Sequence, residues 1–111
     1  MLKSENMNEK VDMHHDICVN LNKIYEAKNH DYGDSFARVR ADYPNAICIR
    51  LWDKLLRLET LVNGEDAMVD ESIDDTLMDL ANYCIMELVE RDIDRDCNVC
   101  KVSDGNVDER R

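Results

Sequence analysis

Residues 71–83 carry four oxygen-bearing side chains at helical spacing. These residues are Glu71, Asp75, Asp79 and Asn82. On a helix that turns about 100° per residue, they fall within about 80° of one another, and apolar residues occupy the opposite side. Carboxylate and amide oxygens are the ligands that Mg²⁺ prefers, usually together with water and substrate phosphate. The pattern predicts a metal site formed by Glu71, Asp75 and Asp79, whereas the alternative interpretation is a solvated acidic face.

A second set of charged residues shares one face of the preceding helical segment. The set consists of Arg50, Asp53, Lys54 and Arg57. One interpretation is local ion pairing around Asp53 at spacings of three and four residues, each pair contributing about 0.2–0.5 kcal/mol. The other is a cationic strip that binds phosphates.

Apolar periodicity predicts the elements that position these residues. Helical spacing extends from about residue 11 to 28, over 36–42, from Pro44 to a stop at Asn63-Gly64, and from about 71 to 94. This pattern predicts an all-α fold, a compact bundle of about four helices. The domain is expected over 9–95, with polar, loosely ordered tails at 1–8 and 96–111. Because the third segment is apolar around about half its circumference, we expect a homo-oligomer, either a dimer or a tetramer.

Composition narrows the class of protein. A net charge of −11 over 111 residues repels a phosphate backbone, so duplex nucleic acid is not an expected partner. No apolar run approaches the ~18 residues that span a bilayer, and the N-terminus lacks the apolar core of a signal peptide, so we predict a cytoplasmic protein without membrane contact. Cys97-x-x-Cys100 and the pair His14-His15 form only a weak zinc signal, and their role stays open.

Three sequence blocks, taken in order, resemble a known family. The blocks are Lys28-x-x-Asp31-Tyr32-Gly33-x-Ser35-Phe36, then Arg50-x-x-Asp53-Lys54-x-x-Arg57-Leu58, then Asp70-Glu71-Ser72-x-x-Asp75-Thr76-x-x-Asp79-Leu80-Ala81-Asn82-Tyr83. Their order and spacing resemble the nucleotide modification associated domain 1 family over roughly residues 15–90.

The resemblance also points to the all-α nucleoside triphosphate pyrophosphatases of the MazG and dimeric dUTPase types. Those enzymes are oligomeric helical bundles that use Mg²⁺ on E-x-x-E and E-x-x-D motifs to release pyrophosphate from nucleotides. Asp79 occupies the place of the final Asp of E-x-x-D, and Asp75 or Glu71 stands in for the acid before it. The E-x-x-E motif is absent, because the preceding helical segment offers only Asp53 and Glu59.

The resemblance implies a role for each candidate residue. Mg²⁺ would be held by Glu71, Asp75 and Asp79, phosphates would be held by Arg50, Lys54 and Arg57, and Asp53 or Glu26 would orient the attacking water. Asp31, Tyr32 and Asn82 would contact the base or sugar, although the segment around Tyr32 is equally well explained as a turn.

The sequence therefore predicts a protein that binds a small nucleotide, and it leaves three hypotheses open. The first is a Mg²⁺-dependent pyrophosphohydrolase that converts a nucleoside triphosphate to the monophosphate and acts on modified nucleotides. The second is a nucleotide-binding, sequestering or accessory protein without turnover. The third is a helical oligomeric interaction module.

Overall fold

The fold consists of helices joined by short connections. A computed structural model of the chain describes residues 3–64 and 72–102, with side chains described for 7–64 and 72–97. Within these ranges there are four helices and no strand, as the apolar periodicity predicts. They are α1 (Lys3–Tyr32), α2 (Ser35–Asp42), α3 (Ala46–Val62) and α4 (Ile73–Val102). Both long helices extend past the bounds that periodicity predicts, and the proposed division into domain and tails stays a prediction.

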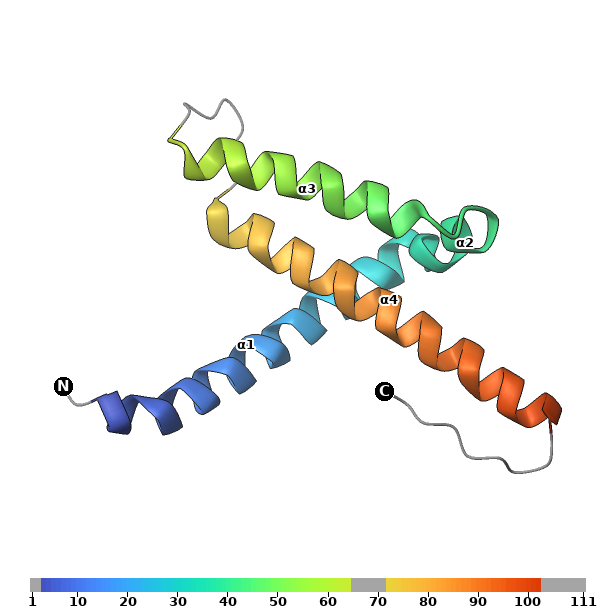
Figure 1. Cartoon of the computed structure of the whole chain (residues 1–111), viewed down its shortest axis with the longest axis horizontal. Coiled ribbons are helices and arrows are strands. Elements are labelled where there is room, and N and C mark those ends of the chain that lie inside the picture. The colour runs from blue at the N-terminus through green and yellow to red at the C-terminus, as the bar shows by residue number, and fades with distance from the viewer. Residues whose placement is uncertain (1–2, 65–71, 103–111) are drawn as a thin grey trace.

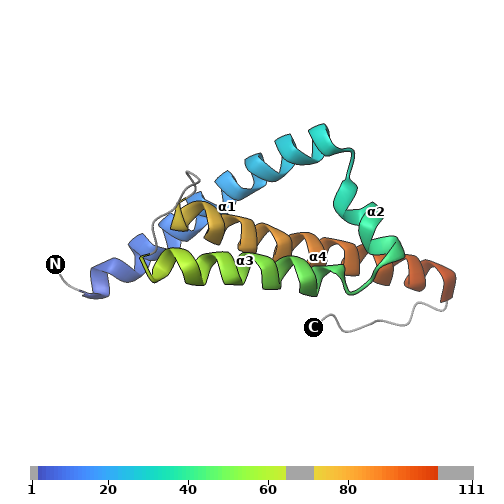
Figure 2. The same cartoon turned by 90° about the horizontal axis from the view of Figure 1, so that it is seen from above.

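Helices α3 and α4 form an antiparallel pair that makes the most extensive contact between elements. The two lie side by side in both views (Figure 1 and Figure 2). Helix α3 ends where the sequence predicts, because the amides of Asn63 and Gly64 bond back to the carbonyls of Glu59 and Leu61. Gly64 has a φ of 80°, a left-handed conformation that glycine adopts without a steric penalty.

The start of α4 is a reciprocal cap. The backbone amide of Asp75 donates to Ser72 Oγ at 3.0 Å, and the amide of Ser72 donates to Asp75 Oδ2 at 3.3 Å. This exchange satisfies backbone amides that have no partner within a helix, as in a capping box. Ser72 is therefore the N-cap of α4.

Helix α1 crosses α4, and α2 connects its far end to α3 (Figure 2). The Asn82 amide on α4 donates to the Leu21 carbonyl of α1 at 3.2 Å and joins the two helices at the crossing. Gly33 and Asp34, with φ of 62° and 58°, turn the chain from α1 into α2. Asp34 occupies the N-cap position of α2 but makes no side-chain cap bond.

A bidentate ion pair fastens α2 to α4. Arg40 Nε and Nη2 donate to the two carboxylate oxygens of Glu87 at 3.0 and 3.2 Å, and Nη1 reaches Asp94 at 3.1 Å. Arg40 and Glu87 are largely shielded from solvent, with side chains 19% and 15% exposed. The pair therefore holds α2, and with it Phe36, against the middle of α4.

Apolar burial is confined to a small part of the molecule. Among the described residues the buried apolar side chains are Leu21, Phe36 and Ala46, which come from three different helices, and Thr76 is the buried polar residue. No helix within 3–64 or 72–102 has the length and apolar character needed to cross a membrane.

Candidate functional site

A hollow of about 370 Å³ lies where the end of α1 and the start of α2 face α3 and α4. It is lined by Tyr25, Lys28, Asn29, Tyr32, Ser35, Phe36, Arg50, Lys54, Asp79, Asn82, Tyr83 and Met86. We refer to it as the site pocket. Its volume falls in the range of about 300–1,000 Å³ typical of small-molecule sites. Five residues predicted from the sequence line it, namely Tyr32, Arg50, Lys54, Asp79 and Asn82.

Asp79 joins two lysines from different helices on one side of the site pocket. Lys54 Nζ of α3 lies 2.9 Å from Asp79 Oδ2, and Lys28 Nζ of α1 lies 3.6 Å from Asp79 Oδ1. The Lys54 and Asp79 side chains are 17% and 27% exposed, whereas Lys28 is 56% exposed. A carboxylate between two ammonium groups holds both near the pocket and neutralises only one of them.

Arg50 contributes a third cation and is held by aromatic rings. Its guanidinium carbon lies 5.8 Å from the centroid of Phe36 and 5.6 Å from that of Tyr83, and Nη1 donates to Tyr83 Oη at 3.5 Å. The two rings lie 6.2 Å apart and tilt by 31°. Cation–π contacts favour a guanidinium in this position and fix its planar donor groups.

The charged residues that line the site pocket give it a net positive charge. Lys28, Arg50 and Lys54 contribute three positive charges and Asp79 one negative charge, which leaves +2. The whole chain has a net charge of −11. A local cationic region in an acidic protein is suited to a small anion that the rest of the surface would repel.

A neutral phenol also borders the site pocket. Burial raises the pKa of Tyr25 above its usual 10.0, and the carboxylates of Asp34 and Glu90 add to the shift. Tyr25 therefore keeps its proton at neutral pH, and its hydroxyl can donate a hydrogen bond.

The predicted metal ligands are not gathered into one cluster. Glu71 lies outside the described residues. Asp75 shares its carboxylate with the Ser72 cap, and Asp79 is engaged by two lysines. No group of three or more His, Cys, Asp or Glu side chains suited to a metal occurs in the described part of the chain. Asp75 and Asp79 do border one further hollow, together with Lys28 and Lys54. The Mg²⁺ assignment stays a prediction.

Three other predicted residues lie away from the site pocket, and a fourth has a second role. Asp53 and Arg57 are exposed on α3 and do not line it. Asp31 lies 3.4 Å from His30 Nδ1 at the exposed end of α1. Asn82 does line the pocket, but its amide nitrogen donates to the backbone of α1, so it also positions the helices.

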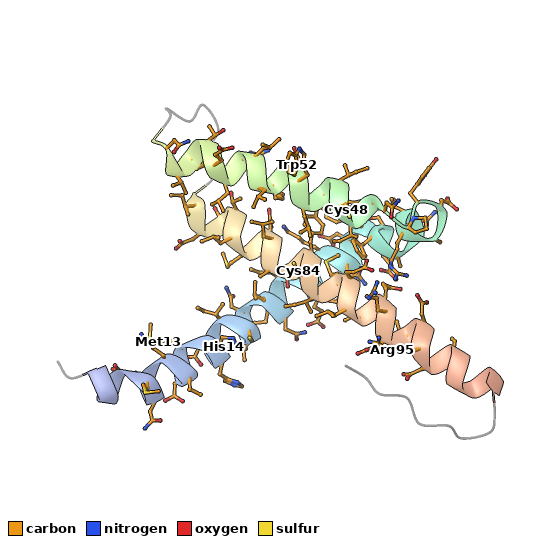
Figure 3. All side chains as sticks on the ribbon, viewed as in Figure 1. Met13, His14, Cys48, Trp52, Cys84 and Arg95 are labelled. Atoms are coloured by element: carbon orange, nitrogen blue, oxygen red, sulfur yellow. The ribbon has the colours of Figure 1, made fainter. Side chains whose placement is uncertain are left out.

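The weak zinc signal gains no support from the arrangement of the helices. Figure 3 shows His14 on α1 and Arg95 on α4 on opposite sides of the place where the two helices cross, and Cys97 follows Arg95 by two residues. His14 Nδ1 instead lies 3.8 Å from Cys18 Sγ, one turn along α1. The Cys100 side chain lies outside the described residues.

Lys28, Phe36 and Tyr83 line the site pocket but are not among the site residues predicted from the sequence. All three occur in the blocks that carry the family resemblance. Nothing local to the sequence pairs them with Asp79 or Arg50, because the partners come from different helices. The blocks themselves were the available signal, since each contributes side chains to the same pocket.

Comparison with known proteins identifies one family. The family model described as nucleotide modification associated domain 1 matches residues 28–90, a little over half of the chain. This segment contains nearly all of the residues that line the site pocket, from Lys28 to Met86. No curated protein and no solved structure matches the chain.

Proposed function

Because the chain belongs to the nucleotide modification associated domain 1 family, we propose that it binds a nucleotide in the site pocket. The observation that carries this proposal is the convergence of three cations and four aromatic rings on one hollow. The cations are Lys28, Arg50 and Lys54, and the rings are Tyr25, Tyr32, Phe36 and Tyr83. A nucleotide combines an anionic phosphate chain with a flat ring, and the pocket offers a complement to each.

The phosphates bind on the cationic side in this proposal. Arg50 has a planar set of donors that match phosphate oxygens in pairs, and the Phe36 and Tyr83 rings already hold it in place. Lys54 and Lys28 supply point charges. An incoming phosphate would take over contacts that the two ammonium groups now make with Asp79.

The base stacks on Tyr32. This side chain borders the site pocket and is 63% exposed, so much of it is accessible to a ligand. Phe36, by contrast, is only 6% exposed and packs with Tyr83 and Arg50. Stacking on an aromatic side chain contributes about 1–3 kcal/mol per base and accepts any base, so Tyr32 supplies affinity rather than base selectivity.

Binding without turnover is the form of the proposal that the contacts favour. Lys28 and Lys54 each make an ion pair with the carboxylate of Asp79. A metal would need the same carboxylate as a ligand. The second candidate is the Mg²⁺-dependent pyrophosphohydrolase related to the all-α pyrophosphatases. The second hollow, which Asp75 and Asp79 both border, supports this candidate. There the two carboxylates and the substrate phosphates would hold Mg²⁺, which would polarise the phosphorus.

A homo-oligomer, a dimer or a tetramer, is also part of the proposal. Exposed large apolar side chains on α1, α3 and α4 support it. The alternative of a purely structural interaction module is tested by the nucleotide measurements.

Two lysine-to-alanine substitutions test the phosphate contacts. Lys28→Ala removes a cation that lines the site pocket, and Lys23→Ala removes an exposed cation of the same helix that does not line it. A buried charge-assisted contact contributes about 1.5–3 kcal/mol, and solvent screening of a half-exposed lysine lowers this to about 0.5–1.5 kcal/mol. We therefore expect Lys28→Ala to weaken binding about two- to tenfold.

Isothermal titration with dTTP and dUTP in EDTA measures the effect, and deoxythymidine serves as the ligand without phosphates. Lys23→Ala should bind like the parent protein. Equal dTTP affinity in the parent and Lys28→Ala proteins would contradict the assignment of Lys28. Pyrophosphate release in Mg²⁺ but not in EDTA would favour the pyrophosphohydrolase over binding alone.

A further inference from the structure

A smaller hollow, of about 160 Å³, lies beside the place where α1 crosses α4. We refer to it as the crossing hollow. Neither the phosphate contacts nor the base stack proposed for the site pocket uses it. Its lining is mainly apolar and includes Leu21 and Tyr25 of α1 and Ile85, Met86 and Val89 of α4.

The crossing hollow has the size and the lining of a site for one flat ring. An apolar cavity of about 150 Å³ can hold a ring the size of benzene. Ile85 and Val89 are 42% and 41% exposed, so they leave apolar surface open to a ligand. The amide side chains of Asn22 and Asn82 border the same hollow, and amides can pair with the polar edge of a base. Apolar walls with a few polar groups are the usual composition of a small-molecule site.

The crossing hollow adjoins the site pocket. Three residues line both of them, namely Tyr25, Asn82 and Met86. On α1 the two sets of lining residues form one stripe, at positions 18, 21, 22, 25, 28, 29 and 32, within an arc of about 120°. Along this stripe Lys28 lies about 6 Å from Tyr32 and about 10 Å from Leu21, measured as rise of the helix. A cation therefore lies between an aromatic ring at one end and the crossing hollow at the other.

We propose that the ligand is a nucleotide whose phosphate bridge carries a second ring at its other end, as in a dinucleotide, and that this second ring occupies the crossing hollow. This occupancy depends on the proposed binding of nucleotide phosphates in the site pocket. One base stacks on Tyr32, and the bridge lies against the three cations. A single base cannot fill both ring sites, because about 16 Å of α1 separates Tyr32 from Leu21.

The charges of the two hollows agree with this ligand. The charged residues that line the site pocket sum to +2, and a diphosphate esterified at both ends carries one negative charge on each phosphate. None of the described residues that line the crossing hollow is charged, so it suits an uncharged ring and not a further phosphate. Tyr25 borders both hollows, and its raised pKa keeps a neutral hydroxyl beside the bridge in place of a phenolate that would repel it.

Calorimetric titration of the parent protein with two ligands of equal charge tests the proposal. One is dithymidine 5′,5′-diphosphate, in which a diphosphate joins two thymidines, and the other is the β-methyl ester of dTDP, which lacks the second nucleoside. Because each stacked or buried base adds affinity, we expect the dinucleotide to bind at least about fivefold more tightly. This exceeds the factor of about two that a symmetric ligand gains by binding in either direction.

The same titration separates this proposal from the proposed function. Binding of both ligands with affinities within about twofold of each other would overturn the second ring site and leave nucleotide binding in the site pocket standing. Binding of neither ligand would overturn both.

Two matched substitutions locate the second ring. Val89→Phe fills the crossing hollow from a residue that does not line the site pocket, and Leu88→Phe enlarges an exposed neighbour that lines neither. We expect Val89→Phe to bind the two ligands within about twofold of each other, and Leu88→Phe to keep the preference of the parent protein for the dinucleotide.

A full preference for the dinucleotide in Val89→Phe would overturn the proposal. So would an equal loss of affinity for both ligands in Val89→Phe, because the single base of the methyl ester would then lie in the crossing hollow. The comparison of the two ligands on the parent protein decides the matter if Val89→Phe does not fold.

Discussion

Asp79→Asn distinguishes the two proposed roles of this carboxylate. If Asp79 holds Lys28 and Lys54 for a phosphate, removing its charge raises the net charge of the site pocket from +2 to +3 and strengthens anion binding in EDTA. If Asp79 is a Mg²⁺ ligand, the same change weakens binding in Mg²⁺ and has little effect without it. The two roles therefore predict opposite signs.

The size of the effect follows from the distances. An anion on the far side of Lys54 Nζ lies about 6 Å from the carboxylate, since Lys54 and Asp79 are 2.9 Å apart. Two unit charges at about 6 Å repel by about 0.7 kcal/mol in water and about 2.8 kcal/mol at an effective dielectric constant of 20. Because Asp79 is 27% exposed, a value of about 1 kcal/mol is appropriate. This energy corresponds to about a fivefold gain in affinity for each negative charge near Lys54.

The assay is titration of dTTP into parent and Asp79→Asn proteins in EDTA and again in Mg²⁺. Asp53→Asn is the matched control, because it removes an exposed acid of α3 that does not line the site pocket. We expect less than a twofold change for the control. Loss of dTTP binding by Asp79→Asn in EDTA, with circular dichroism unchanged, would contradict a role of Asp79 in holding Lys28 and Lys54 for a phosphate.

Two further predictions concern stability. Ser72→Ala removes the side-chain half of the α4 cap and should lower the free energy of unfolding by about 1 kcal/mol, measured by chemical denaturation; an unchanged midpoint would contradict the cap. Burial, and then the Asp34 carboxylate, raise the pKa of Glu90, so the folded state disfavours its ionised form. Glu90→Gln should therefore raise the melting temperature at pH 7, and the gain should vanish below about pH 4, where the carboxyl is protonated in both states. A gain that is equal at pH 4 and pH 7 would argue against this cause.

Much of the fold can be predicted from the sequence because helices depend on residues close together in the chain. Apolar periodicity predicts four helices, and Asn63-Gly64 predicts the end of α3. Asp75 carries two local signals. Its spacing from Asp79 predicts a metal face, which stays a prediction, and its distance of three residues from Ser72 is the capping-box spacing that the structure uses.

The site is harder to predict from the sequence because its contacts join residues far apart in the chain. Asp79 meets Lys28 and Lys54 only because α1 crosses α4 and α3 runs beside it. Arg50 was predicted as a phosphate ligand from its helix face alone. Its position between Phe36 and Tyr83 depends on α2 folding against α4, and no helical wheel contains that information.

The most direct test of the central claim is calorimetric titration of the parent protein with dTTP, dTMP and deoxythymidine in EDTA. We expect saturable binding of dTTP to one class of site, with affinity that falls as phosphates are removed and as salt is added. Binding of dTTP no tighter than deoxythymidine, or no binding of any of the three, would contradict a site pocket that recognises nucleotide phosphates.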